Sequence, residues 1–299
     1  MINDTRRAWR HKSVCALMRS AGGNDPVAII RSKSKALVEF AKGQGWEGPP
    51  YNPLELASLR GIRSRQADGL FSAEAQLTPT EDRQLLLEFN PDRAPGRKNY
   101  SISHELVHTL FDDCFEMVHQ RKSDPKAFDP QQEVEHLCQV GAAEILMPEE
   151  DFRADLARLD LSLRAVVEFC DRYQASREAV ARRMLALTGE TAALLFLSKR
   201  LKPSEKNGED LNGVRPEERL RILYVVQTPT FPVFLPAHKS APDNSCAYII
   251  RVADEVAERR ETWNLPGFGD WIVEAMGLPI PDPTDVTSPS VMALVLPDR

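Results

Sequence analysis

Apolar residues recur at helical spacing through much of the first two thirds of the chain, which predicts a mainly helical region there. The predicted helices are Ser32 to Lys42, Leu54 to Leu59, Arg97 to Phe111, Glu133 to Met147, and two segments near 161–173 and 177–188. Two short strands are predicted between them, at Gly69 to Phe71 and at Arg83 to Asn90. The polar segment 112–130 is predicted to be a connecting loop.

The pattern changes after Thr188-Gly189, where strand composition replaces helical spacing. Strands are predicted at Ala192 to Leu201, Arg219 to Gln227, Ser245 to Val252 and Val291 to Leu296. A polar segment, Lys202 to Glu218, is interpreted as a loop or linker. Both helices and strands are therefore expected, and we predict the α+β fold class.

Composition narrows the class of protein. The chain has 299 residues, of which 42% are hydrophobic and 27% charged, which is enough apolar material for one large or two ordinary domains. Five widely spaced cysteines without a CxxC pair argue against a disulfide framework and for a reducing compartment. We find neither a membrane-length apolar run nor a secretory signal, so we expect a cytoplasmic protein without a membrane partner.

Charge is unevenly distributed. The net charge of −6 argues against a general nucleic-acid binder. The first 40 residues nevertheless contain eight Lys or Arg and three Asp or Glu, a local charge of 8 − 3 = +5. We interpret this region as a solvated or loosely ordered basic arm, with contact to DNA or an acidic partner as the alternative.

The sequence His104-Glu105-Leu106-Val107-His108 contains the candidate chemistry. Four residues of helix turn about 400°, so both imidazoles leave the same face, where they can bind one zinc ion. Glu105 is placed to take a proton from the attacking water and pass it to the leaving amine. This pentapeptide also arises by chance on ordinary helices, so a third ligand is required. His119, in the loop that follows, is either a nearby proton donor or a plain surface histidine.

Glu135 is the best third ligand in the next predicted helix. At about 100° per residue, it shares a face with Cys138 and Ala142, which must pack inward. Glu133 and Glu144 fall on the opposite, outward face. A carboxylate on a packed face is costly unless it is paired or binds a metal. A buried salt bridge to an arginine is the alternative. Small residues at 141–143 would also let this helix approach another one closely.

Two long motifs give the chain a family resemblance. The segment Arg97 to His108 resembles the active-site segment of the ImmA/IrrE metallopeptidases, and Val134 to Pro148 resembles their second helix. The likeness covers roughly residues 45–200 and is strongest to the IrrE-like radiation-response members of deinococci. It implies zinc ligands His104, His108 and Glu135 with Glu105 as the catalytic base, and Glu135 is also the residue chosen by its position on the helix. Manganese or iron at the same site in the cell stays open, because the ligand types only favour zinc.

The resemblance also implies a fold and a function. The fold would be a minimal zincin-like metallopeptidase domain with a small sheet, followed by a helix-turn-helix-like segment and a C-terminal, GAF-like mixed α/β domain. The corresponding boundaries are 1–45 for a basic, helical extension, 46–152, 153–190 and 191–299. The implied function is cleavage of a helix-turn-helix transcriptional repressor, usually encoded nearby, which switches on stress, DNA-damage or mobile-element genes.

Two other functions are kept open. The chain could be a DNA- or signal-binding transcriptional regulator with a vestigial zincin site, although all four site residues are intact. It could also be the protease of a toxin–antitoxin or phage-defence operon, which has the same chemistry and another target. In the helix pair near 161–188, Arg177, Arg182 and Arg183 could contact phosphates. We favour the simpler interpretation, in which this pair packs against the peptidase.

Overall fold

The chain divides into two compact units, which we describe separately. The computed structural model describes residues 9–68, 73–116, 132–202, 217–250, 252–265, 267, 269–279 and 288–298. Within these, the helical unit comprises residues 9–155 with 169–179, and the sheet unit comprises residues 156–168 with 180–298. The unit boundaries therefore fall inside three helices, α7 (Glu149–Leu156), α8 (Leu163–Tyr173) and α9 (Arg177–Leu187).

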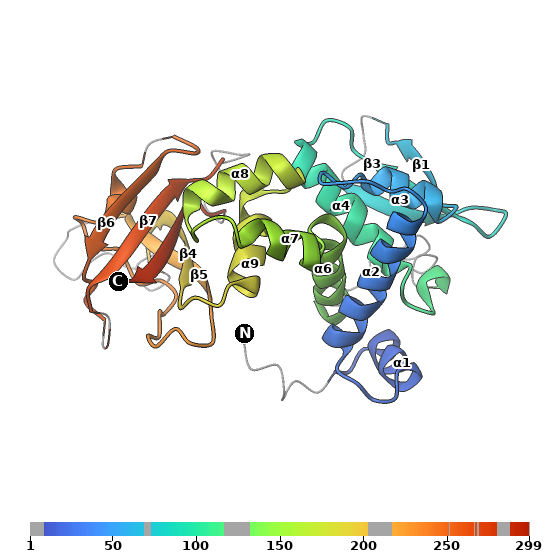
Figure 1. The fold of residues 1–299 in the computed structure, drawn as a ribbon, viewed down its shortest axis with the longest axis horizontal. Helices are drawn as coiled ribbons and strands as arrows, with labels where there is room; N and C mark the ends of the chain where they lie inside the picture. The colour runs from blue at the N-terminus through green and yellow to red at the C-terminus, as the bar shows by residue number, and fades with distance from the viewer. Residues whose placement is uncertain are drawn as a thin grey trace. The chain divides into compact units, whose positions relative to one another are not determined.

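Helices make up most of the helical unit (Figure 1). They are α1 (Lys12–Ser20), α2 (Pro26–Gly43), α3 (Pro53–Leu59), α4 (Pro95–His108), α6 (Gln132–Leu146) and α7 (Glu149–Leu156). The side chains of Asp25 and Asn52 cap α2 and α3, and a proline at the first helical position starts each of α2, α3 and α4. Because proline presets a helical φ and lacks an N–H that would go unused there, these starts are locally encoded.

A three-stranded sheet completes the helical unit. Its strands are β1 (Arg63–Gln66), β2 (Ala75–Pro79) and β3 (Leu85–Phe89), in the order β1-β3-β2. β3 is parallel to β1 and antiparallel to β2, so β2 lies at an edge of the described sheet. Helix α4 packs against β2 and β3, which places the HExxH helix beside the edge strand.

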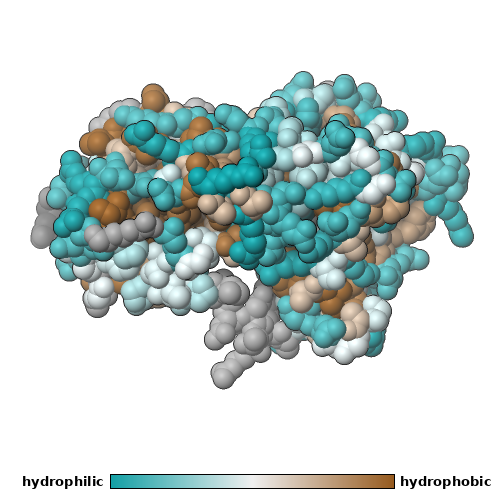
Figure 2. All heavy atoms as spheres, viewed as in Figure 1, coloured by the Kyte–Doolittle hydropathy of each residue, from teal (hydrophilic) through white to brown (hydrophobic). Residues whose placement is uncertain are grey.

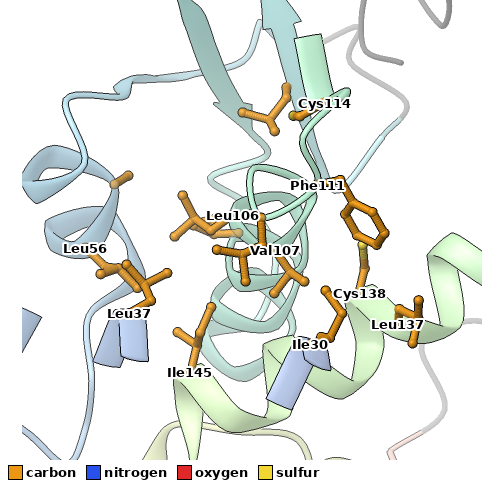
Figure 3. Close-up of a cluster of buried hydrophobic side chains, with 14 of the residues drawn as sticks. Ile30, Leu37, Leu56, Leu106, Val107, Phe111, Cys114, Leu137, Cys138 and Ile145 are labelled. Carbon is orange, nitrogen blue, oxygen red and sulfur yellow. The ribbon is translucent and has the colours of Figure 1, made fainter. Parts of the chain in front are cut away.

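One hydrophobic core joins these helices (Figure 3). Figure 3 shows Leu106 and Val107 of α4 among side chains from α2, α3 and α6. The predicted apolar side of α4 is confirmed, since Ile102, Leu106 and Leu110 are all buried. Helix α6 packs against both α4 and α2, so α4 and the following helix meet inside the core.

The expectation of a loosely ordered N-terminal arm is wrong. Residues 12–20 form α1 and residues 26–43 form α2, and both helices contribute to the core through Val14, Leu17 and Ile30 among others. Most basic residues of these two helices are exposed, and the buried apolar positions lie between them in the sequence. The net charge of the segment therefore did not predict its packing. The N-terminal helices thus belong to the same compact unit as the HExxH helix.

The sheet unit contains a five-stranded antiparallel sheet. Its strands are β4 (Ala193–Arg200), β5 (Arg219–Gln227), β6 (Val256–Glu261), β7 (Trp271–Gly277) and β8 (Val291–Pro297). Their spatial order is β5-β4-β8-β7-β6, so the first strand pairs with the last. The first six residues of β4 are all buried, which requires cover on both faces of the sheet. One face packs against side chains of the β5–β6 connection, including Phe231, Cys246 and Ile250.

Most predicted elements are confirmed with small shifts at their ends, and one is wrong. Residues 245–252 are not a strand, because Ser245 caps a short 3₁₀ helix at Cys246–Tyr248. The predicted strand at 69–71 lies outside the described residues, as do most of the loop at 112–130 and of the linker at 202–218. The sequence analysis missed α1, α7, β1, β2, β6 and β7.

The surface and the helix lengths are those of an ordinary globular chain. Hydrophilic side chains predominate on the face drawn in Figure 2, and hydrophobic ones form small patches. Among the described residues, none of the helices combines the length and the apolar composition that crossing a bilayer requires. The cytoplasmic location stays a prediction.

Candidate metal centre

Helices α4 and α6 bring two histidines and a glutamate together. The Nε2 atom of His104 lies 2.9 Å from Oε2 of Glu135, and Nε2 of His108 lies 3.7 Å from Oε1 of the same carboxylate. The two imidazole rings meet edge to face with their centroids 5.2 Å apart. The two histidines thus each direct one nitrogen toward the Glu135 carboxylate. These three residues are called the His–His–Glu cluster below. The alternative for Glu135, a buried salt bridge to an arginine, stays an untested prediction.

A glycine allows the two helices to approach this closely. A Cβ atom at Gly141 of α6 would lie 2.7 Å from both γ-carbons of Val107 and 2.8 Å from Oγ of Ser34. Such distances are shorter than van der Waals contact, so any larger residue must push α6 away from α4 and α2. The close approach predicted from the small residues at 141–143 is therefore confirmed at Gly141.

Glu105 is buried beside the cluster and held by the sheet. Its side chain is 6% exposed, and its Oε2 atom accepts a hydrogen bond of 3.0 Å from the backbone N–H of Leu77 in β2. The edge strand thus fixes the orientation of this carboxylate. A fixed carboxylate next to two imidazoles is the arrangement that proton transfer to a bound substrate requires.

A cavity of about 290 Å³ opens at the same place. His104 and Glu105 line it together with Glu74, Ala75, Tyr100, Ser101 and Gln139. The sequence analysis did not single out Tyr100 or Gln139. Helical spacing would have found both, because Tyr100 lies one turn before His104 and Gln139 lies one turn after Glu135.

The mouth of this cavity contains an acidic group paired with arginines. Oε1 of Glu74 lies 2.6 Å from a guanidinium nitrogen of Arg97 and 3.5 Å from Nε of Arg93. Both arginines are largely exposed, so these pairs contribute little to stability. They link the residue before β2 to the first turn of α4, the helix that contains His104.

Residues 62–185 match the IrrE N-terminal-like domain of the peptidase M78 family. This stretch contains the whole cluster, Glu105 and the edge strand that holds it. The matched stretch and both curated relatives support the ImmA/IrrE family for this domain. A domain of this kind accounts for two helices and a small sheet around a group of metal-binding residue types.

Two curated relatives with a similar sequence are metalloproteases. The radiation response metalloprotease IrrE of Deinococcus deserti is 30% identical over 194 residues, which cover 62% of this chain and 63% of that protein. The protein of the same name from Deinococcus radiodurans is 30% identical over 105 residues, covering 34% of this chain and 30% of that one. The chain thus spans less than two thirds of the length of either relative.

One solved structure has a similar fold. A transcriptional regulator of Mycobacterium tuberculosis matches with a TM-score of 0.55 over 95% of this chain and 79% of its own length. The sequence identity is 13%, so this likeness concerns the fold alone.

A metalloprotease family implies a divalent metal, and two ligand sets must be compared. The ligand atoms of His104, His108 and Cys138 lie within 4.8 Å of one another, so a His–His–Cys set exists alongside the His–His–Glu cluster. Cys138 is fully buried, and its Sγ lies 3.5 Å from Nδ1 of His108, on the edge of the ring opposite Nε2. The side chain of Glu135 is 28% exposed and faces the Nε2 atoms of both rings.

The donor chemistry of the IrrE-like domain favours the His–His–Glu set. Two imidazoles and a carboxylate with solvent access match a catalytic zinc site, which keeps one position open. The Cys138 thiol instead occupies the place of an outer partner that orients a ligating imidazole. Zinc therefore fits the residues present, with Cys138 as a support for His108.

The sequence analysis also made predictions for Glu144 and His119, near the cluster in sequence. Glu144 was expected on the outward face of α6 but is buried, and its Oε1 accepts a hydrogen bond from the backbone N–H of Glu149 at the start of α7. The outward assignment was wrong because the Glu144 carboxylate binds the first N–H group of α7 and because α6 packs against both α2 and α4. His119 lies outside the described residues.

The arginines of α9 are packed against the chain's own side chains. The guanidinium of Arg182 lies 5.3 Å from the ring centroid of Phe196 and 5.2 Å from that of Tyr224. Arg183 is 8% exposed. The contacts of Arg182 lie within the sheet unit, so they do not test whether the 161–188 helix pair packs against the peptidase. Direct DNA binding also stays an untested prediction.

Proposed function

We propose that this protein is a zinc-dependent endopeptidase whose ligands are His104, His108 and Glu135 and whose general base is Glu105. The observation that carries the proposal is the convergence of both Nε2 atoms on the Glu135 carboxylate, next to Glu105 and at the wall of an open cavity. The match to a domain of the peptidase M78 family and the names of both curated relatives support it.

Each residue of the site has a separate role in peptide-bond hydrolysis. A bound zinc ion would polarise the scissile carbonyl group and make water more acidic. Glu105, oriented by the Leu77 N–H, takes a proton from the attacking water and then gives this proton to the leaving amine. Cys138 orients the His108 ring through Nδ1.

The edge strand suits an extended substrate. β2 lies at the edge of the described sheet, and its first residue, Ala75, lines the cavity with Glu105. A peptide segment could add to this edge by backbone hydrogen bonds, which need no particular side chain. This arrangement supports internal cleavage of a protein chain in an extended segment.

We further propose that the substrate is a co-encoded helix-turn-helix transcriptional repressor, whose cleavage derepresses stress or DNA-damage genes. The words "radiation response" in the names of the relatives support this role. The test is incubation of the purified chain with the repressor of the adjacent operon, with and without zinc, followed by mass spectrometry. Zinc-dependent fragments from one cleavage position are expected.

The same experiment separates the proposal from its alternatives. An intact repressor in the presence of zinc would contradict the repressor as substrate. Cleavage of a neighbouring antitoxin instead would point to a toxin–antitoxin operon. Zinc-independent DNA binding without any proteolysis would favour a regulator with a vestigial site.

For the sheet unit we propose a GAF-like fold that senses a signal. The support is the five-stranded antiparallel sheet in which β4, the first strand, lies between β5 and β8. The long β5–β6 connection covers one face of this sheet, where a sensor domain would hold its ligand. An experimental structure of the full chain with a different strand order would contradict this assignment.

A further inference from the structure

The start of α1 contacts helix α6 and the segment that follows α4. Backbone N–H groups of Arg10 and His11 donate hydrogen bonds of 2.9 Å and 2.8 Å to the Glu133 carboxylate in α6. The Ser13 hydroxyl donates one of 2.6 Å to Asp113, five residues past the end of α4 at His108. We call residues Trp9–Ser13 the N-terminal clasp.

An aromatic contact extends the clasp along α6. The Trp9 ring stacks on the His136 ring with an interplanar angle of 20° and a centroid distance of 6.4 Å. The clasp therefore touches Glu133 and His136, the residues on both sides of Glu135 along the helix. It is anchored in turn, because Val14 and Leu17 of α1 are buried in the core of the helical unit.

The first turn of α6 needs such support more than the rest of the helix. Its N–H groups have no acceptors one turn earlier in the helix, so a first turn opens more readily than the middle. Glu133 and Glu135 both lie in this turn. The position of a zinc ligand in this turn therefore depends on how stable the turn is.

The charges at the contact are favourable. Glu133 and Asp113 both face the N-terminus of α1, where the helix dipole and the unused N–H groups attract negative charge. Hydrogen bonds from backbone N–H groups to a carboxylate are short and stronger than those between neutral groups. The clasp thus joins the segment after α4 and the beginning of α6 through two carboxylates.

We propose that the N-terminal clasp positions Glu135 for metal binding by fixing the first turn of α6. This inference rests on the proposed His–His–Glu metal site. It assigns to residues 9–13 a role in metal affinity, although they are distant from the cluster in sequence and contribute no ligand. Loss of the clasp loosens Glu135 while His104 and His108 stay in place on α4.

The test uses variants of the full-length protein that remove the contact from either side. Arg10→Pro deletes the backbone donor, whereas Arg10→Ala keeps it and is the matched control. Glu133→Ala deletes the acceptor, whereas Glu133→Gln keeps an acceptor oxygen without the charge. Zinc dissociation constants are measured by chelator competition, and amide hydrogen exchange is measured in the metal-free protein.

We expect Arg10→Pro, which loses one hydrogen bond to a charged group, to weaken zinc binding about tenfold. Glu133→Ala loses the hydrogen bonds from both Arg10 and His11 and should weaken zinc binding at least as much. Arg10→Ala should stay within about twofold of the parent, and Glu133→Gln should fall between. In the metal-free protein, the amides of residues 134–138 should exchange faster in the two deleting variants, and those of α4 should not.

Two results would contradict the proposed role of the clasp. One is zinc affinity within about twofold of the parent in both deleting variants. The other is unchanged exchange at residues 134–138 in Glu133→Ala, a measurement that stands even if Arg10→Pro fails to fold. A parent protein that binds no zinc would instead contradict the proposed metal site, and the exchange data would then decide the clasp alone.

Discussion

Both units bury ionisable groups, but they use them differently. In the sheet unit, Glu261 accepts hydrogen bonds from the backbone N–H of Cys246 and from the Trp263 indole, and Glu274 accepts one from the backbone N–H of Leu163. In the helical unit, His104, His108 and Glu135 face one another. In the sheet unit, these buried carboxylates therefore accept hydrogen bonds from backbone N–H groups and an indole. In the helical unit, three metal-binding side chains lie together at one point.

The difference shows how a functional site can be distinguished from buried carboxylates that only stabilise the fold. Burial of a carboxylate does not by itself mark a site, since Glu261 and Glu274 are each only 7% exposed. Glu144 in the helical unit is also structural, because it caps α7. What marks the metal centre is the convergence of several metal-binding side chains next to a cavity. The predictions below test this distinction.

The largest expected effect is on catalysis, from Glu105→Gln. The amide keeps the shape of the side chain and can still accept from Leu77, but it cannot take a proton. Cleavage of the repressor should fall about 10²- to 10⁴-fold while zinc stays bound. Cleavage rates and zinc content of parent and variant check this, and full activity in the variant would remove Glu105 from the mechanism.

Glu261→Ala should affect stability alone. It removes the acceptor of two donors in a buried environment, at a cost of about 1–3 kcal/mol for each. Thermal unfolding should show the loss, whereas zinc content and cleavage rate at a permissive temperature should not change. Glu258→Ala on the same strand is the control, since Glu258 is exposed. Loss of zinc in Glu261→Ala would erase the contrast between the units.

Gly141→Ala should affect both stability and metal binding. The new methyl group would overlap Val107 and Ser34, so we expect a loss of about 1–3 kcal/mol and weaker zinc binding. Gly43→Ala is the matched control, because a Cβ there meets nothing within 4 Å. Denaturant unfolding and chelator competition measure the two effects, and equal behaviour of both variants would show that the close helix approach is not needed.

Glu274→Gln should give the smallest effect and should stabilise the protein. Burial raises the pKa of Glu274 above its ordinary value, so the folded chain holds the proton more tightly than the unfolded chain does. This contribution to stability is present below the unfolded pKa and is lost as pH rises through the folded pKa. The variant should therefore unfold at a higher temperature than the parent near neutral pH, and this gain should shrink in acid. A gain that does not depend on pH would contradict this assignment.

The sequence predicted the centre better than it predicted the fold around it. The i, i+4 spacing of the histidines and the position of Glu135 on the packed face identified the cluster, because both depend only on helix geometry. The predictions for Glu144 and for the strand at 245–252 were wrong because tertiary contacts decide both. The Glu144 carboxylate binds the N–H of Glu149, and the Glu261 side chain accepts from the N–H of Cys246. The clasp could not be predicted, since its hydrogen-bonded partners are at least 100 residues apart in the chain.

The central claim is that Glu135, and not Cys138, completes the metal site. The most direct test is the zinc content of the purified full-length chain and of two single variants, Glu135→Ala and Cys138→Ala. One zinc ion per chain is expected in the parent and in Cys138→Ala, because Cys138 only supports His108, and none is expected to remain in Glu135→Ala after dialysis. Zinc retained in Glu135→Ala but lost in Cys138→Ala would contradict the account and assign the site to His104, His108 and Cys138.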